Sequence, residues 1–288
     1  MVRFGLRETG RYAAGLLGAV LLAAIVSGLG TGGVLAGALV RLMALLHLNF
    51  GASAMTGAPA ATELAKRLPA TLELLGGGAL IALLLGVPLG LLLSWGRALR
   101  AGAPLIQLVA AAPVFCAGLL LLWIAHHFGW DVTARMGLSF WPSLAQLDFP
   151  SALRAAPAFG LPALVVGAAG SAAIQLAVRR AAKDAVREPY RDGLRLMGLS
   201  SFEIDWLYLA PRVVAGLFAG LGEVALSLFA ATAVAEWVFD WPGAATLFIH
   251  SVALADWNVA GLVLFVFAAL TLTASFLGTL AARALGQA

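Results

Sequence analysis

Six long apolar runs constrain the fold of this chain more than any other feature of its sequence. They cover approximately residues 12–30, 72–95, 104–127, 157–178, 213–235 and 258–282. Each run has about the 20 residues that an α-helix needs to cross roughly 30 Å of hydrocarbon. None shows the two-residue alternation of barrel strands, so helices are the expected spans. The sequence predicts an all-α, polytopic membrane protein with six transmembrane helices in one domain, residues 1–288.

The composition supports the same fold class. Hydrophobic residues make up 62% of the chain and charged residues only 11%, which excludes an ordinary soluble domain. A sequence pI near 9.8 would suggest nucleic-acid binding in a soluble protein. Here the positive-inside rule explains the basic excess, so we expect membrane lipid and no nucleic acid among the partners.

The basic residues also predict the topology. With the N-terminus in the cytoplasm, thirteen of the eighteen Lys and Arg residues fall on the cytoplasmic side. Only five fall outside: Arg41, Lys66, Arg67, Arg135 and Arg154. This asymmetry predicts that both termini are cytoplasmic. Arg3, Arg7 and Arg11 before the first run would also suit a cleaved secretory signal, but an even number of spans favours a retained helix.

The most polar stretch of the chain, residues 179–212, lies between the fourth and fifth runs. It holds seven of the eighteen basic residues and five of the fourteen acidic ones. Gly198 is typical of a helix terminator, and Ser200 or Ser201 is expected to cap the next helix with Glu203 near the capping-box position. Short amphipathic helices around a glycine turn indicate a cytoplasmic docking element.

This stretch resembles the signature cytoplasmic loop, often written EAA…G, of the inner-membrane permease subunits of ATP-driven, binding-protein-dependent (ABC) importers. Glu188, Gly198, Leu199, Ser200 and Pro211 occupy matching positions. The family's small residues before the glycine are replaced here by Gly193, Leu194, Leu196 and Met197. The resemblance implies the following ATPase-coupling residues: Glu188, Tyr190, Arg195, Gly198, Leu199, Ser200 and Pro211.

Other segments resemble the dipeptide/oligopeptide/nickel branch of that family. They are RLPATLEL (67–74), GVPLG (86–90), APVFCAGLLLL (112–122) and EWVFDWPG (236–243). The shortened outer regions look most like the antimicrobial-peptide or polyamine (Sap-type) permeases. The resemblance implies the type I ABC importer permease fold and a multi-pass subunit of the bacterial inner membrane. Such a subunit moves peptides or related small solutes, including nickel or metallophores and polyamines.

The resemblance also implies partners. The family's complex contains a homologous second permease, usually in a heterodimer, two cytoplasmic ATPase subunits and an extracytoplasmic solute-binding protein. The residues agree on one point: Lys66 and Lys183 are the only lysines, and neither precedes Ser or Thr, so no GxxxxGK[ST] phosphate loop exists. We therefore expect ATP and Mg on the ATPase partners, no cofactor in this chain and no enzymatic activity of its own.

Glu223 is the first candidate for the substrate path, because it lies about ten residues into the fifth run. A charge at mid-membrane costs roughly 2.5–3.5 kcal/mol, so the side chain should face a cavity or a partner. No basic residue in any run is obviously placed to neutralise it. We expect Glu223 either to line the path and favour cationic or amine-bearing substrates, or to have a hydrogen-bonded packing role.

Pro113 and Phe115 in the third run and Glu73 in the second complete the substrate-path candidates. A structural or gating role is favoured for Glu73, and Pro113 is expected to kink its helix. No metal site is expected, because the adjacent His126 and His127 would point about 100° apart on a helix.

An alternative function is an intramembrane enzyme such as a rhomboid-like serine protease, for which GASA (51–54) is the best support. That segment falls in an outer loop, and no histidine is suitably placed in a later run. An ion channel or receptor would need polar rings or a ligand domain, which the sequence lacks. The transporter subunit is favoured over both alternatives.

The predicted topology can be tested by cysteine labelling after Cys116 is replaced by Ala. Ala145→Cys should react with a membrane-impermeant maleimide in intact cells, because its loop is expected outside. Asp192→Cys should react only after the membrane is permeabilised. Reversed labelling would contradict the orientation derived from the basic residues.

Overall fold

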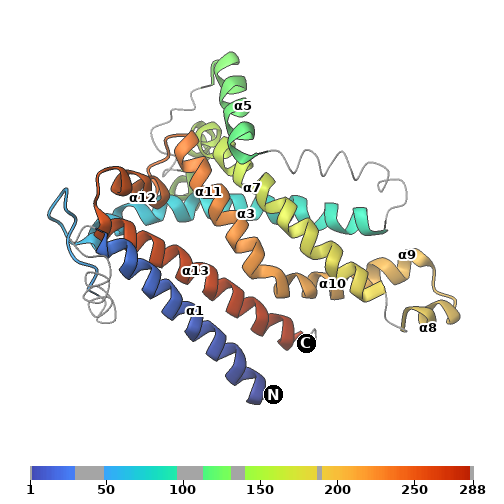
Figure 1. Ribbon diagram of the computed structural model, residues 1–288. Helices are drawn as coiled ribbons and strands as arrows, with labels where there is room; N and C mark the ends of the chain where they lie inside the picture. The colour runs from blue at the N-terminus through green and yellow to red at the C-terminus, as the bar shows by residue number, and fades with distance from the viewer. Residues whose placement is uncertain (1, 30–48, 96–112, 131–139, 187–189, 286–288) are drawn as a thin grey trace.

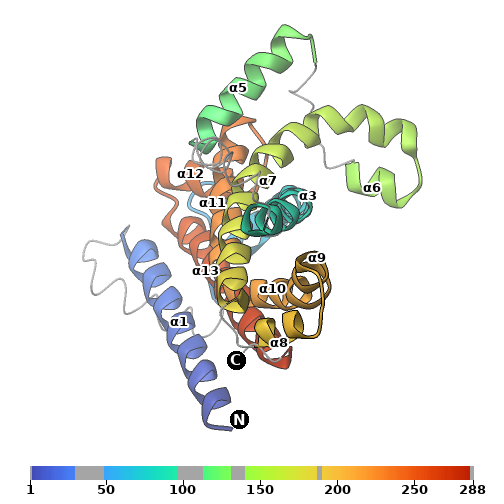
Figure 2. The same ribbon diagram turned by 90° about the vertical axis from the view of Figure 1, so that its right-hand side faces the viewer.

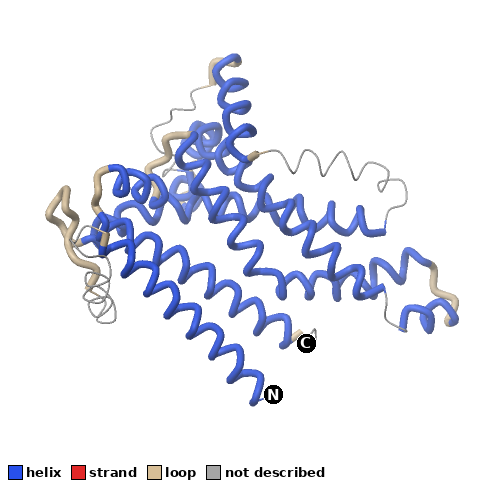
Figure 3. Tube along the Cα trace, in the orientation of Figure 1, coloured by secondary structure: helices blue, strands red, loops and turns tan. Residues whose placement is uncertain are grey.

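The computed structural model describes residues 2–29, 49–95, 113–130, 140–186 and 190–285. Within these ranges the chain is helical with short connections, and no strand is present (Figure 3). The longer helices are α1 (Val2–Gly28), α3 (Ala60–Trp95), α5 (Val114–His127), α7 (Phe149–Val186), α11 (Leu221–Val238) and α13 (Trp257–Ala284). The shorter elements are α6 (Phe140–Ala145), α8 (Tyr190–Leu196), α9 (Ser201–Glu203), the π-helix η2 (Ile204–Leu209), α10 (Ala210–Leu217), the 3₁₀ turn η3 (Phe218–Gly220) and α12 (Ala244–Ala253).

Five helical segments of the described chain are long and apolar enough to cross a membrane. They are Glu8–Gly28, Ala60–Ser94, Ala158–Ala185, Ser201–Val238 and Trp257–Ala284. The all-α, polytopic fold is thereby confirmed. The predicted run 104–127 begins outside the described residues, and its described part is the 14-residue helix α5. The count of six spans therefore stays a prediction.

Several helices extend beyond the apolar runs predicted from the sequence. The second helix begins at Ala60 rather than near residue 72, and the fourth continues to Val186 rather than ending near 178. The charged stretch 179–212 is consequently less of a loop than expected, because its first residues extend α7. Hydropathy marks where a helix leaves hydrocarbon, whereas Ala-rich polar segments such as RRAAKDAV continue the backbone hydrogen bonds beyond that point.

The fifth span also begins earlier than expected, since the chain is helical without interruption from Ser201 to Val238. Its regular α-helix is broken twice, by η2 just before Pro211 and by η3 at Phe218–Gly220. The Ala210 N–H bonds the Asp205 carbonyl five residues back, in the π pattern. Pro211 has no N–H of its own to donate, so the helix changes pitch where a regular bond would be missing.

The helices α3 and α7 form the most extensive helix–helix contact of the described bundle. A Cβ added to Gly86 would lie 2.7 Å from the Ile174 Cβ, and one added to Gly90 would lie 2.8 Å from the Val178 Cβ. Ile174 and Val178 are buried in the main core. The Gly86-x-x-x-Gly90 spacing thus allows the two backbones to approach, as small residues do in membrane bundles.

Figures 1 and 2 show how the ends of the helices are distributed. The first and last helices, α1 and α13, run side by side, and both termini lie at the end of the molecule where α8 and α9 project (Figures 1 and 2). The short helix α12 lies at the opposite end of α1 and α13 (Figure 1). The molecule therefore has one end formed by the polar hairpin and the termini, and another that carries α12.

The glycine contact predicts a selective loss of stability. Gly86→Val should lower the free energy of unfolding by about 1–3 kcal/mol, because the added methyl groups overlap Ile174. Gly76→Val is the matched control: it lies in the same helix, and a Cβ there meets nothing within 4 Å. Thermal unfolding of the detergent-purified variants measures the difference. Equal stability of the two variants would contradict the packing of α3 on α7.

Candidate functional site

The α8–α9 hairpin, residues 190–209, has the helix–glycine–helix form that the sequence predicts. Gly198 has a φ of 86°, a conformation that residues with a Cβ rarely adopt, and its N–H bonds the Arg195 carbonyl at 3.0 Å. Ser200 and Glu203 form a complete capping box. The Glu203 N–H donates to the Ser200 Oγ at 3.3 Å, and the Ser200 N–H donates to the Glu203 carboxylate at 2.8 Å. These local bonds fix the angle between the two short helices.

The hairpin has a buried face and an exposed one. Leu194 and Ile204 belong to the main core, and Leu199 packs against it. Around its turn, three large apolar side chains, which we call the hairpin patch, are mostly exposed: Leu196 (89%), Met197 (77%) and Phe202 (71%). Apolar side chains exposed together on a polar element are typical of a surface that binds another protein.

The structure separates the predicted coupling residues by role. Gly198 and Ser200 shape the turn, Leu199 anchors the hairpin, and Pro211 starts α10. Arg195 lies exposed in the last turn of α8, which begins at Tyr190. Glu188 lies outside the described residues. The hairpin patch was not predicted from the sequence, although Leu196 and Met197 are among the residues that depart from the family's small ones.

A second group of polar residues lies at the α12 end and joins two segments far apart in sequence. Glu236, in the last turns of α11, is fully buried. Its carboxylate accepts hydrogen bonds from the Thr71 hydroxyl at 2.6 Å and from the N–H groups of Ala245 at 2.8 Å and Thr246 at 3.0 Å. The last two donors are in the first turn of α12, where N–H groups have no partner within the helix. The Glu236 carboxylate therefore caps the start of α12.

Thr71 and Trp241 complete this group, which we call the Glu236 cluster. The Thr71 hydroxyl accepts from the Ala244 N–H at 2.7 Å, and the Trp241 indole N–H donates to the Ala70 carbonyl at 3.0 Å. Gly243 is required because a Cβ there would overlap the Glu236 carboxylate. The cluster thus brings together RLPATLEL on α3 and EWVFDWPG after α11, two segments that the sequence analysis singled out without pairing them.

A third polar contact lies beside a smaller buried apolar cluster that includes Ala60, Leu64 and Val259. The buried Ser53 hydroxyl donates to the buried carboxylate of Asp256, the residue immediately before α13. The Asn258 side-chain amide also donates to the Ala52 carbonyl at 2.8 Å. These bonds hold the 51–59 loop against the start of α13. Ser53 of the GASA segment is therefore engaged in a structural contact, and this gives no support to a serine protease.

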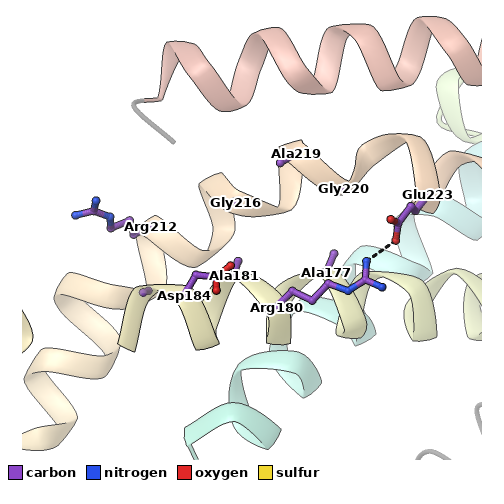
Figure 4. A pocket seen from close by; sticks show the side chains of 10 residues that line it. Ala177, Arg180, Ala181, Asp184, Arg212, Gly216, Ala219, Gly220 and Glu223 are labelled. Carbon is purple, nitrogen blue, oxygen red and sulfur yellow. Dashed lines mark hydrogen bonds and ion pairs between the residues drawn. The ribbon is translucent and has the colours of Figure 1, made fainter. Parts of the chain in front are cut away.

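The pocket around Glu223 changes the prediction for that residue. The Arg180 Nη1 lies 2.6 Å from the Glu223 Oε2 (Figure 4), and the two side chains are 56% and 68% exposed. The expectation that no basic residue neutralises Glu223 is wrong. Arg180 was assigned to a loop, but α7 continues past it and carries its guanidinium to α11. The pair lines a pocket of about 300 Å³ between α7 and the α10–α11 run.

The remaining predicted path residues do not line this pocket. Pro113 precedes α5 as its N-cap with a ψ of 131°, so it begins a helix and does not kink one. Phe115 on α5 is half exposed, and Glu73 is half-buried in the interior of α3. Among the described residues no group of His, Cys, Asp and Glu is arranged to hold a metal, and His127 stacks on Trp123 with ring centroids 5.7 Å apart.

Comparison with known proteins decides the family. Residues 78–288 match the model of the family described as "Binding-protein-dependent transport system inner membrane component". The chain belongs to this family. Its members span the inner membrane as permeases, which agrees with the apolar helices and the projecting hairpin.

Individual relatives share a little over a quarter of their residues with this chain. A probable D,D-dipeptide transport system permease protein, DdpB of Escherichia coli (strain K12), is 28% identical over 74% of this chain and 67% of its own length. The peptide transport system permease protein SapB of Salmonella typhimurium is 26% identical over 74% and 72%. The dipeptide transport system permease protein DppB of Haemophilus influenzae is 26% identical over 73% and 68%.

The Glu236 cluster predicts a specific effect of one hydroxyl group. Thr71→Val keeps the shape of the side chain but removes the hydroxyl that donates to the Glu236 Oε1 and accepts from the Ala244 N–H. The variant should lose about 1–3 kcal/mol of stability. Thr71→Ser, which keeps the hydroxyl, is the control. Thermal unfolding and limited proteolysis near α12 measure the effect, and a Thr71→Val protein as stable as Thr71→Ser would contradict the cluster.

Proposed function

We propose that this chain is the membrane-spanning permease of an ATP-driven transporter of peptides or related small solutes, and that its hairpin patch is the contact with the ATPase subunits. The observation that carries the proposal is the exposure of Leu196, Met197 and Phe202 on an otherwise anchored hairpin. Exposed apolar side chains are unfavourable in water, so three of them on an anchored element indicate a surface that a partner covers. A rigid projection with an apolar tip suits insertion into a cleft of a partner.

The hairpin is placed to transmit movement. Its second half is the beginning of the helical run Ser201–Val238. This run is about 57 Å long by the usual helical rise. Near the far end of that run Glu236 caps α12 and bonds α3 through Thr71. A displacement of the hairpin by the ATPases would therefore act on the opposite end of the molecule through one continuous element.

The other partners are also part of the proposal. We infer a homologous second permease in a heterodimer, two cytoplasmic ATPase subunits that bind ATP and Mg, and an extracytoplasmic solute-binding protein. The names of the relatives support peptides as the solute class. The basic residues support cytoplasmic termini, and the termini share one end of the molecule with the hairpin (Figure 2). Tyr190, Arg195 and Glu188 remain proposed contacts with the ATPase subunits.

The proposal predicts a loss of coupling without a loss of folding. Leu196→Glu combined with Met197→Glu should lower ATP-dependent uptake at least about tenfold, because two buried charges would oppose an apolar contact. The ATPase subunits should also fail to co-purify with the permease. Uptake into proteoliposomes and subunit stoichiometry measure these effects.

Leu147→Glu is the matched control, since Leu147 is 72% exposed and lies far from the hairpin, between α6 and α7. This variant should keep the ATPases bound. A double hairpin variant that retains both ATPase subunits and normal uptake would remove the basis of the proposal.

A further inference from the structure

An apolar groove lies beside the first half of α1, between this helix and α11. Both helices pack on α13, which forms the floor of the groove (Figure 1). Gly15, Gly18 and Ala19 line it from α1, while Phe229 of α11 and Phe267 of α13 contact each other along its other side, with ring centroids 5.6 Å apart. The groove has a volume of about 510 Å³. We call it the α1 groove.

The lining of the α1 groove offers hydrocarbon and almost nothing polar. Thr271 is the one polar residue among those that line it, and its hydroxyl already donates to the Phe267 carbonyl at 2.9 Å. The small residues of α1 leave open space, since a Cβ added to Gly18 would meet no atom within 4 Å. The surface therefore suits an apolar chain and not a polar solute.

The α1 groove lies at the depth of one leaflet. With the N-terminus in the cytoplasm, α1 enters the membrane near Tyr12, a residue type typical of the interface. The Tyr12 ring stacks on Phe276 with centroids 4.8 Å apart, and its hydroxyl lies 3.0 Å from the Thr273 hydroxyl. From Gly15 to Leu22 the groove covers roughly 10 Å of helix beyond this level. This length fits within the cytoplasmic half of a hydrocarbon core roughly 30 Å thick.

Arg11 lies at the cytoplasmic end of the α1 groove. It precedes Gly15 by four residues and Gly18 by seven, so it lies on the face of α1 that lines the groove. Its side chain is 78% exposed, and its Nη1 bonds the mostly covered Glu8 at 2.8 Å. A guanidinium has five N–H donors, and an exposed pair at this spacing contributes little stability. Arg11 can therefore also bind a phosphate at the mouth of the groove.

The charge at this end favours a lipid over a second permease as the occupant. The first eleven residues contain three arginines, Arg3, Arg7 and Arg11, and one acidic residue, Glu8. A homologous permease would follow the same positive-inside rule and bring further basic residues to this side of the membrane. An anionic phospholipid supplies the opposite charge together with an apolar chain.

We propose that the α1 groove binds an anionic phospholipid of the cytoplasmic leaflet, with one acyl chain between α1 and α11 and its phosphate on Arg11. The chain covers the apolar lining of three helices and thereby holds α1 in position beside α11. This site goes beyond the proposed transport function and depends only on the orientation of α1 in the membrane.

Photo-crosslinking in phosphatidylcholine nanodiscs that contain the complex of permeases and ATPases tests the site. The probes are phosphatidylglycerol and phosphatidylcholine with the same diazirine-bearing acyl chain, and mass spectrometry identifies the labelled peptides. Phosphatidylglycerol should label peptides of the α1 groove about fivefold more than phosphatidylcholine, the ratio expected for one arginine near a lipid phosphate. Both probes should label Leu84, an exposed residue of α3, equally. Equal labelling of the groove by the two probes would overturn the proposal.

Two substitutions separate the acyl chain from the headgroup. Gly18→Leu fills the groove and should lower its labelling by both probes at least about fivefold. Gly160→Leu on α7 is the matched control, because a Cβ there also meets nothing within 4 Å. Arg11→Gln should abolish the preference for phosphatidylglycerol but leave labelling by phosphatidylcholine unchanged, and Arg11→Lys should restore the preference. Labelling of the groove that survives Gly18→Leu unchanged would show lipid that merely surrounds the protein, and would also overturn the proposal.

The second permease is the other occupant that the experiment can reveal. If neither probe labels the groove in the wild-type complex and Gly18→Leu releases the second permease during purification, that subunit covers the groove and the lipid site does not exist. The comparison of the two probes on the wild-type complex needs no substitution, so it decides the proposal even where a variant fails to fold. ATP-dependent uptake by the same complex tests the transport function separately.

Discussion

Hydrocarbon offers no hydrogen-bond partner to a backbone N–H or C=O group, and each unpaired group there costs several kcal/mol. This constraint explains why the described chain is helical almost throughout, and it also explains the places where the helices deviate. At Pro211 the missing N–H is accommodated by a π-turn and not by a loop. Where α12 begins, its first N–H groups are satisfied by a side chain, Glu236, brought from another helix.

The two carboxylates of α11 illustrate how surroundings assign a role. Glu236 is fully buried, and hydroxyl and backbone donors surround its oxygens, so it holds α3, α11 and α12 together. Glu223 lies between three and four turns earlier on the same helix, is mostly exposed and bonds one guanidinium. A carboxylate satisfied by several fixed donors cannot exchange partners without breaking the fold. A carboxylate paired with one exposed arginine can exchange partners, and this distinguishes the surroundings of Glu223 from those of Glu236.

The spans could be predicted because hydropathy is a property of each segment taken alone. The same holds for the turn at Gly198 and the capping box of Ser200 and Glu203, whose bonds join near neighbours. The Glu236 cluster could not be predicted in this way, since Thr71 and Glu236 are 165 residues apart and only the packing of α3 brings them together. The Arg180–Glu223 pair was missed for another reason. Arg180 looked like part of a loop, because sequence polarity marks the membrane boundary and not the end of a helix.

The fifth span links the sites at the two ends of the molecule, and its irregular turns divide it into segments. The π-helix η2 is the last part of the hairpin and joins it to α10, and η3 joins α10 to α11. A Cβ at Gly278 of α13 would overlap the Phe218 carbonyl, so α13 packs directly on η3. The pocket that Arg180 and Glu223 line extends along α10 and across η3, so a change in pitch at η3 would alter the distance between Arg212 and Glu223. The hairpin and this pocket are thus joined through a single helical run.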